Sequence, residues 1–463
     1  MATKRNSSQR ALWQHESAPA VLRGVDNGPA IEIHAHHVQA SGDRWFGAFL
    51  DANRSNLDQL SLRPEIHAGL TTTLRLHPSE HIGAVPLFSP STRRVVAGLV
   101  VSARLGWHSL GSVLGGIGFQ VEPRIQGDVL VPGSAREVPV WLLAAPVIRA
   151  IEDYILHRKQ GFIEKRELKS SPRGRIDWAA WARKQVPKGQ WDSFPCRYYE
   201  TGDDPTFLSA IRWTLRTIDH QLQRYDAAPP ARLLRQRITL LQPLIGAGAA
   251  IRPHAELRAS DSEWIASAAR AMQWVADERG LGGLQRLDGI SWSLSIHEVW
   301  EAWVDELMKS LAPSLGLQHV PRKQTQRGIH WETPLRSMTK LVPDSALTGA
   351  DRMVWIDAKY KPHLHHLART GWHGLSDDMQ AAHRADLHQA LAYSALSEDA
   401  VVDSLLVYPL LGRETAPPHA TATLTRGRRL LRLHLIGVPF GFSSEHAREQ
   451  TRLRLQEALR MER

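Results

Sequence analysis

Cysteine is almost absent from this sequence: Cys196 is the single one among 463 residues. One thiol supports no internal disulfide framework, and it excludes zinc fingers and cysteine-ligated iron–sulfur clusters, which need several cysteines. No GxxxxGK[ST] loop occurs either, so the chain has no evident nucleotide-hydrolysing motor of its own. These absences exclude zinc fingers, iron–sulfur clusters and a nucleotide-hydrolysing site. Any metal site would have to use oxygen and nitrogen ligands.

Long apolar runs are also missing. The least polar stretch, residues 105–121, is too short and too rich in glycine to span a membrane. The polar N-terminal residues do not form the apolar core of a signal peptide. We therefore expect a soluble, cytoplasmic protein.

Basic residues are in excess: 57 Lys and Arg stand against 47 Asp and Glu, for a net charge of +10. This excess favours polyanionic partners such as nucleic acid, without indicating a fold or a reaction. A chain of this length also predicts more than one domain.

Hydrophobic patterning divides the chain into four expected parts. Residues 1–28 are polar and predict a flexible tail. Short alternating or continuous apolar runs then predict a β-rich domain, and apolar residues at helical spacing, such as Phe207, Ile211 and Leu215, predict a helical segment. We expect the β-rich domain at 29–140, the helical middle domain with a basic loop at 141–288, and an α/β C-terminal domain at 289–463.

A helix over Val299–Leu311 opens the most informative region. Its apolar residues form one stripe of helical period, and Glu301 lies at the edge of that stripe, where a carboxylate can reach an internal cleft. Glu298 is expected to point toward solvent. An ordinary surface acid is the alternative interpretation of Glu301.

Two short strands follow the helix. Leu341–Ser345 leads into a turn at 348–351, and Met353–Lys361 continues as a largely buried strand. Residues two apart in a strand face the same way, so Asp357 and Lys359 emerge side by side. The hairpin brings Asp344 close to that pair.

Phosphodiester hydrolysis explains why these residue types would be collected. Magnesium or manganese prefers hard oxygen ligands, and we expect Asp344, Asp357 and the Ala358 carbonyl to supply them, with Glu301 as a more distal ligand. Lys359 would orient a water or stabilise developing charge. Asp-x-Lys alone is a weak signal, but Pro-Asp thirteen residues earlier strengthens it.

A second helix carries Asp386, Gln389 and Tyr393 on one face. Gln389-x-x-x-Tyr393 resembles the QxxxY motif of RecB-like members of the PD-(D/E)XK nuclease superfamily, where the pair helps to hold the active site and DNA. An apolar strand, Ser404–Pro409, completes the helix–strand–strand–strand–helix–strand order of that core. The resemblance implies a restriction-endonuclease-like fold with a central mixed sheet.

Three segments resemble the McrC subunit of McrBC-type restriction systems. They are DAKYK at 357–361, WEAWV at 300–304 and the RGRI segment at 173–176, which Asp204-Pro205 follows. The resemblance implies a DNA endonuclease that works with a separate AAA+ GTPase or ATPase, whose ring the N-terminal domain would engage. The missing phosphate-binding loop fits this division of labour.

Several basic side chains are candidates for DNA contacts: Arg173, Arg175, Arg322, Lys323, Arg327 and Lys361. The run from Arg322 to Arg327 either binds phosphates or forms an exposed turn. The insertion 362–383 holds five histidines and is expected to be a solvated polar loop, with a metal site as the alternative.

Two other functions compete with a restriction nuclease. One is a non-catalytic, DNA-binding regulatory subunit that activates a partner NTPase. The other is a stand-alone repair nuclease of RecB-like type, which would cut DNA without a partner. Loss of function in an Asp357→Ala variant would exclude the first of these.

Overall fold

The computed structural model describes most of the chain and divides it into two compact units. The described residues are 20–34, 44–67, 72–132, 138–158, 161–254, 262–278, 289–332, 337–410, 418–426, 429–442 and 444–460. The first unit comprises Met1–Leu142, Asp226–Leu233 and Leu287–Arg463, and the second comprises Leu143–Tyr225 and Leu234–Arg286. Among the described helices, none is both long and apolar enough to cross a membrane.

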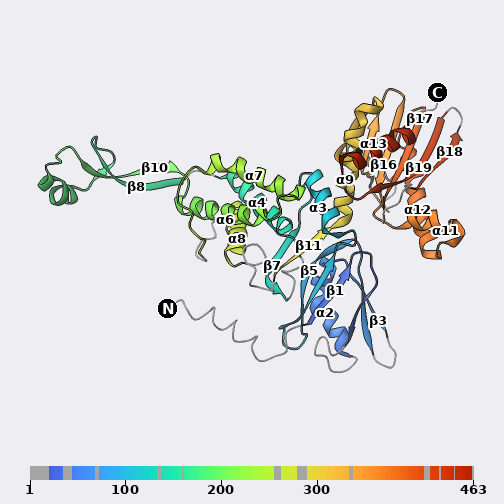
Figure 1. Ribbon diagram of the computed structural model, residues 1–463, viewed down its shortest axis with the longest axis horizontal. Helices are drawn as coiled ribbons and strands as arrows, with labels where there is room; N and C mark the ends of the chain where they lie inside the picture. Colours follow the sequence, from blue (N-terminus) through green and yellow to red (C-terminus); the bar gives the residue numbers. More distant parts are fainter. Residues whose placement is uncertain are drawn as a thin grey trace. The chain divides into compact units, whose positions relative to one another are not determined.

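Two sheets and helix α2 (Arg44–Gln59) build the N-terminal part of the first unit (Figure 1). The larger sheet has the order β1-β6-β5-β11-β7, with bounds Ala20–Val25, Val95–Ser102, His81–Phe88, Gly289–Ser295 and Arg124–Val131. The smaller sheet has the order β2-β4-β3, with bounds Ile31–His34, Thr73–His77 and Arg63–His67. Phe46 and Phe49 of α2 are buried against both sheets in one apolar core. Helix α3 (Gly106–Gly116) follows β6.

The sheet corrects two predicted boundaries. Ala20–Val25 is strand β1, paired in parallel with β6, so these residues do not belong to a tail; residues 1–19 lie outside the described part of the chain. Strand β11, predicted to open the C-terminal domain, instead lies between β5 and β7. The first boundary was misplaced because β1 is a short run, Ala20–Val25, that directly follows a polar segment.

Helices dominate the second unit, as predicted. They are α4 (Val140–His157), α6 (Pro205–Gln223), α7 (Pro229–Ile245) and α8 (Glu263–Ala276). Helix α6 begins at Pro205 because the Asp204 carboxylate accepts hydrogen bonds from the Thr206 and Phe207 amides, and proline at the first turn forfeits no bond.

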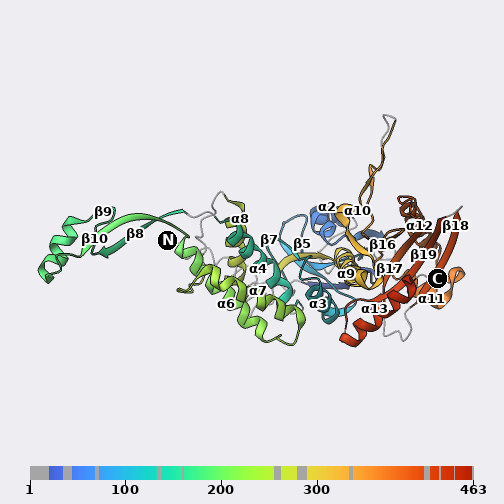
Figure 2. The same ribbon diagram turned by 90° about the horizontal axis from the view of Figure 1, so that it is seen from above.

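The expected basic loop is largely a hairpin. Strand β8 (Gly161–Lys169) pairs with β10 (Phe194–Gly202), and β9 (Arg175–Ile176) pairs with the other edge of β10. The hairpin extends away from the helices of its unit and ends in short helical turns, α5 (Trp178–Ala180), η2 (Trp181–Gln185) and η3 (Val186–Lys188) (Figures 1 and 2).

A mixed six-stranded sheet forms the C-terminal part of the first unit, as the α/β prediction requires. Its order is β12-β15-β16-β17-β19-β18, with bounds Gln318–Pro321, Ser345–Thr348, Arg352–Ala358, Val401–Leu410, Arg429–Pro439 and His419–Arg426. Strands β16, β17 and β19 run parallel, and the other neighbours are antiparallel.

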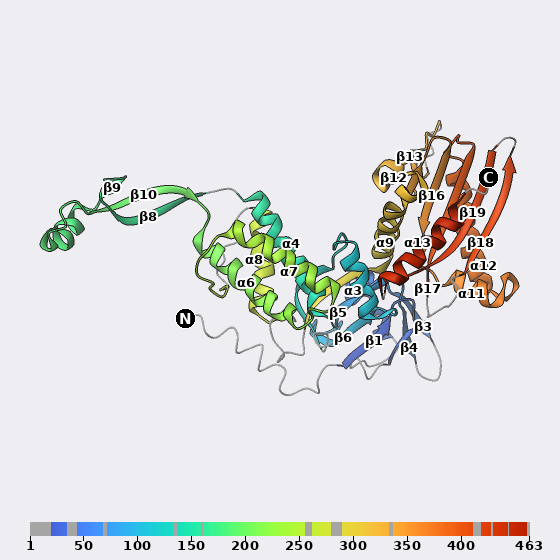
Figure 3. The same cartoon turned by 45° about the horizontal axis from the view of Figure 1, so that its top comes forward.

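Helices cover both faces of this sheet. Helices α9 (Ile296–Leu311) and α13 (Glu445–Leu459) lie on one face, and α11 (His363–Thr370) and α12 (Asp377–Ser394) lie on the other (Figure 3). Ser295 and Ser376 accept hydrogen bonds from amides of the first turns of α9 and α12, which fixes where these helices begin. Between β12 and β15 the chain forms α10 (Arg322–Thr325) and the short pair β13 (Arg327–Gly328) and β14 (Lys340–Leu341).

Candidate active site

The β15–β16 hairpin brings the two predicted aspartates together. Ser345 pairs with Ile356 in the antiparallel register, so Asp344 lies beside the end of β16. Its Oδ2 accepts a hydrogen bond of 2.8 Å from the Ala358 amide. Thr325 of α10 fixes the backbone just before Asp344, because its hydroxyl donates to the Pro343 carbonyl at 2.7 Å.

Asp357 and Lys359 face one another at the end of β16, as their spacing predicts. Lys359 Nζ lies 2.8 Å from Asp357 Oδ2, and both residues are buried. Lys359 Nζ also donates to Gln389 Oε1 at 2.7 Å. The Gln389 amide donates in turn to the Tyr393 hydroxyl at 2.5 Å, and that hydroxyl lies 3.3 Å from the Val342 carbonyl. Helix α12 therefore holds the lysine head in one place.

Asp386, one turn before Gln389, holds a second lysine. Lys361 Nζ donates to Asp386 Oδ1 at 2.7 Å, and Lys359 Nζ lies 3.9 Å from the same oxygen. His363 Nδ1 is 3.8 Å from Asp386 Oδ2, and the Tyr408 hydroxyl is 3.4 Å from it. Burial alone raises the pKa of Asp386, but the bonds from His363 and Lys361 outweigh burial and lower it.

Glu301 reaches the site from α9, and two cations hold it. Its Oε1 lies 2.9 Å from His297 Nε2, one turn earlier, and its Oε2 forms an ion pair with Arg322. Burial alone raises the pKa of Glu301, but these two partners lower it; the bond to Glu301 raises the pKa of His297. Glu298 lies on the more exposed side of α9, as predicted. Sequence reasoning missed His297, although its position four residues before Glu301 is the spacing of a helical pair.

Asp344 is the least compensated carboxylate of this group. Its nearest cation is Arg322, whose Nη1 lies 3.9 Å from Asp344 Oδ1. Burial and the negative charges of Asp357 and Glu301 raise the pKa of Asp344 to about 8. Burial and the charges of Asp357 and Asp344 raise the pKa of Tyr393 to about 12. When all three carboxylates are ionised, the charge of Asp344 is therefore the one left in excess of its nearby cations.

A divalent cation fits that excess. Asp344 and Asp357 supply hard oxygens, and magnesium commonly uses one or two carboxylates and keeps several waters. No group of three or more His, Cys, Asp or Glu residues in the described ranges is arranged to hold a metal ion. Glu301 is engaged by Arg322 and His297, so its role as a distal ligand stays a prediction, as does that of the Ala358 carbonyl.

The remaining predicted residues are placed as follows. Lys323 and Arg327 are exposed in and just after α10, close in sequence to Arg322. Arg173 and Arg175 are exposed at the β8–β10 hairpin, in the second unit; Arg173 pairs with Glu200 at 3.3 Å. Their contacts with DNA stay a prediction.

The histidine-rich insertion is not a polar loop. His363–Thr370 forms α11, and the segment runs on through η5 (Trp372–Gly374) into α12. His363 and His383 are buried: His363 lies 3.8 Å from Asp386, and the His383 ring lies 5.9 Å from the Trp372 ring. The alternative of a metal site finds no support among the described residues.

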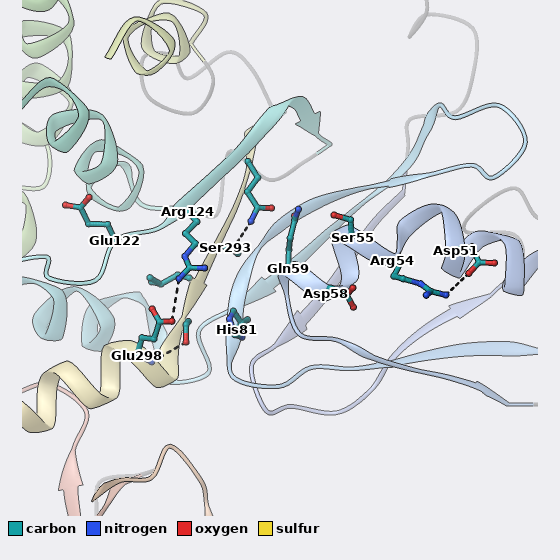
Figure 4. A pocket seen from close by; sticks show the side chains of 13 residues that line it. Asp51, Arg54, Ser55, Asp58, Gln59, His81, Glu122, Arg124, Ser293 and Glu298 are labelled. Atoms are coloured by element: carbon teal, nitrogen blue, oxygen red, sulfur yellow. Dashed lines mark hydrogen bonds and ion pairs between the residues drawn. The ribbon is translucent and has the colours of Figure 1, made fainter. Parts of the chain in front are cut away.

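A separate hollow of about 690 Å³ lies on the N-terminal sheet (Figure 4). Its charged side chains largely satisfy one another: Arg54 bonds Asp51 at 2.8 Å, and Arg124 lies 3.6 Å from Glu298 at the start of α9. Two of its acids are therefore paired with arginines, and none of the predicted site residues lines it.

Comparison with known proteins gives one family. Residues 283–409 match the family described as McrBC, a McrBC 5-methylcytosine restriction system component. The chain is similar to this family over that segment. The resemblance predicted from DAKYK and WEAWV is thereby confirmed, since both lie inside the matched residues. No curated protein matches the sequence.

Two solved structures from Thermococcus gammatolerans show weak similarity to this McrC-like chain. One is the refined half-complex from a tetradecameric assembly of McrB AAA+ hexamers with bound McrC, at 14% identity and a TM-score of 0.43, covering 96% of this chain and 100% of that one. The other is the McrBC complex, at 11% identity and a TM-score of 0.26, covering 64% and 88%.

Proposed function

We propose that this McrC-like chain is the metal-dependent DNA endonuclease subunit of a McrBC-like restriction system, acting with a separate AAA+ GTPase or ATPase. One observation carries the proposal: Asp344, Asp357 and Lys359 converge at the end of β16, with Gln389 of α12 on the lysine. The helix–strand–strand–strand–helix–strand order around them supports a PD-(D/E)XK core.

Each residue has a physical role in phosphodiester hydrolysis. Asp344 and Asp357 would hold magnesium or manganese, which neutralises phosphate charge and lowers the pKa of a coordinated water. Lys359 has its ammonium fixed by Asp357 and Gln389, so it can stabilise developing charge without first being ordered. Lys361, Lys323 and Arg327 would contact backbone phosphates, and Tyr393 would keep Gln389 oriented.

A partner is part of the proposal because of what the chain lacks. No phosphate-binding loop occurs in the sequence, while the McrBC match indicates a system whose components divide the work. In the solved Thermococcus gammatolerans assembly, McrC is bound to McrB AAA+ hexamers, and we propose an equivalent partner here.

The test is cleavage of methylated and unmethylated plasmid with magnesium, with and without a McrB-like AAA+ protein from the same source. Wild type is compared with Asp357→Ala, and Asp351→Ala, in the exposed hairpin turn, is the matched control. We expect cleavage by wild type and by the control, and none by Asp357→Ala. Dependence on the AAA+ protein separates a restriction subunit from a stand-alone repair nuclease.

A non-catalytic subunit is the second candidate. The contact that favours it is the Arg322–Glu301 ion pair, which neutralises one of the predicted ligands without a metal. In that case Asp357→Ala would leave stimulation of the partner NTPase and function in cells unchanged, and no condition would give metal-dependent cutting.

A further inference from the structure

Asp26 is a carboxylate with no exposed surface, at the turn that follows β1. The Arg104 amide donates to its Oδ1 at 2.6 Å. The hydroxyl of Tyr360 donates to its Oδ2 at 2.7 Å. A buried carboxylate needs such partners, and here one of them comes from a residue 334 positions away, inside the DAKYK segment.

Arg104, just after β6, completes the enclosure of Tyr360. Its Nε lies 3.3 Å from the Tyr360 hydroxyl and 3.5 Å from Asp26 Oδ2, and its guanidinium carbon lies 4.7 Å from the centre of the tyrosine ring. Burial raises the pKa of both Asp26 and Tyr360. The tyrosine is thus held at its hydroxyl and over its ring by two residues that directly follow strands β1 and β6 of the N-terminal sheet.

Tyr360 stands between the two lysines of the site. The Lys359 amide donates to the Val407 carbonyl at 2.8 Å, and the Lys361 amide donates back to the Lys359 carbonyl at 2.9 Å. This tight turn leaves little freedom between neighbouring residues. Fixing the Tyr360 side chain therefore fixes the directions in which Lys359 and Lys361 leave the backbone.

Aromatic packing ties the same point to the Glu301 helix. The Tyr360 ring lies 6.0 Å from the ring of Phe440, which stacks on Trp300 at 5.8 Å. Trp300 Nε1 donates to the Val407 carbonyl at 3.2 Å, the same oxygen that accepts the Lys359 amide. A displacement of Tyr360 would therefore reach both the lysine and the residue beside Glu301.

We propose that Tyr360, anchored by Asp26 and Arg104, is a positioning residue that aims Lys359 and Lys361, so that the N-terminal sheet is a working part of the nuclease site. This inference rests on the proposed nuclease function. An ordinary interdomain contact would hold the two sheets together without affecting the lysines.

The variants Tyr360→Phe and Asp26→Asn each remove one partner of the hydroxyl contact with little change of shape. Ser112→Ala is the matched control, because the Ser112 hydroxyl also joins the N-terminal part to the C-terminal part, through the Phe442 carbonyl at 3.1 Å, but away from the lysines. All three are made in the full-length chain.

Plasmid cleavage is the first measurement. We expect Tyr360→Phe and Asp26→Asn to lower kcat about 10- to 100-fold, because small misplacements of catalytic groups cost that much, while KM for DNA changes far less. The double variant should be no slower than the worse single one, since the two residues act as one unit. Ser112→Ala should keep wild-type kcat.

Hydrogen exchange of the peptide spanning 357–362, in the chain alone, is the second measurement and needs no nuclease activity. We expect faster exchange in Tyr360→Phe and Asp26→Asn and no change in Ser112→Ala. Unchanged exchange in Tyr360→Phe and Asp26→Asn overturns the proposal. Faster exchange in these variants, if they keep the kcat of wild type, overturns it as well. If wild type itself does not cleave while exchange responds as expected, the proposed function fails and the anchoring of the lysine segment stands.

Discussion

Asp403, which is buried, and Asp344, which is partly buried, differ in how the protein compensates their negative charge. Asp403, in β17, has no exposed surface and accepts bonds from Arg352 at 2.7 Å, Arg432 at 2.7 Å and His434 at 3.0 Å. Burial alone would raise its pKa, but the bonds and charges of these partners lower it. Asp344 has the Ala358 amide and a more distant arginine, and its pKa is raised to about 8.

The difference supports the proposal that the charge of Asp344 is functional and that of Asp403 is structural. Asp403 is fully balanced by the protein, so nothing further is required there. Asp344 shares its surroundings with Asp357 and Glu301, whose basic partners lie closer to them than Arg322 lies to Asp344. A buried site that keeps an unbalanced charge is stable only if something else supplies the counter-charge, which is why perturbed carboxylates concentrate at functional sites.

The largest effect is expected from Lys359→Ala, which removes the cation nearest to Asp357 and the group that would stabilise developing charge. Cleavage should fall by about 10²–10⁴-fold. Lys361→Ala should cost far less, because the Lys361 side chain is one-third exposed and its ammonium pairs with Asp386 rather than with Asp357. Rates on a linear DNA substrate check both, and equal losses in the two variants would contradict the assignment of Lys359.

Asp403→Asn is expected to affect stability rather than chemistry. Losing the charge leaves Arg352, Arg432 and His434 facing a neutral amide in a buried position, which costs about 3–5 kcal/mol. Urea unfolding measures this cost, and Asp399→Asn, in the partly exposed turn before β17, is the control. A cost below about 1 kcal/mol would show that the cluster is not the balanced charge described above.

Asp344→Asn should change how stability depends on pH in metal-free protein. Because the folded pKa is raised to about 8 from 3.8, the stability that protonated Asp344 provides is complete at acidic pH and is lost as pH rises toward 8. The asparagine variant should lack that loss. Its free energy of unfolding, relative to that of wild type, should therefore rise by about 1–3 kcal/mol from pH 5.5 to pH 8.5.

Urea unfolding at the two pH values with a chelator measures this gain, and parallel pH dependence of the two proteins would refute it. Magnesium at pH 8.5 should stabilise wild type and not the variant, because the ion supplies the missing counter-charge.

The smallest effects are expected from the exposed basic residues. Lys323→Ala and Arg327→Ala should each weaken DNA binding uniformly across sequences and reduce the slope of log K against log salt by about 1. Arg173→Ala and Arg175→Ala test the hairpin in the same way. Fluorescence anisotropy between low and moderate salt checks these changes, and an unchanged slope removes the residue from the proposed DNA contacts.

Local spacing predicted the site's inner residues. Two positions along one strand place Asp357 beside Lys359, and four along one helix place Gln389 beside Tyr393, because strand and helix geometry fix these relations without tertiary information. The glycine of the RGRI segment has a similar local reason: Gly174 has φ +67°, and a Cβ there would lie 2.5 Å from the Arg197 carbonyl.

Contacts between segments far apart in the chain could not be predicted from the sequence. Tyr360 meets Asp26 across 334 positions, and neither residue carries a pattern that points to the other. The balanced cluster at Asp403 draws its partners from β16 and β19, whose pairing depends on the whole sheet. The predicted domain of β11 was wrong because a short apolar run does not reveal which sheet receives it.

The position of β11 has a consequence for biosynthesis. The chain leaves the N-terminal sheet at Val131 and returns at Gly289, and these two residues pair directly. Until Gly289–Ser295 emerges from the ribosome, β5 and β7 each keep an open edge, and open edges invite pairing with other chains. A fragment that stops after β7 should therefore aggregate, and supplying residues 289–295 by a short turn should suppress that aggregation.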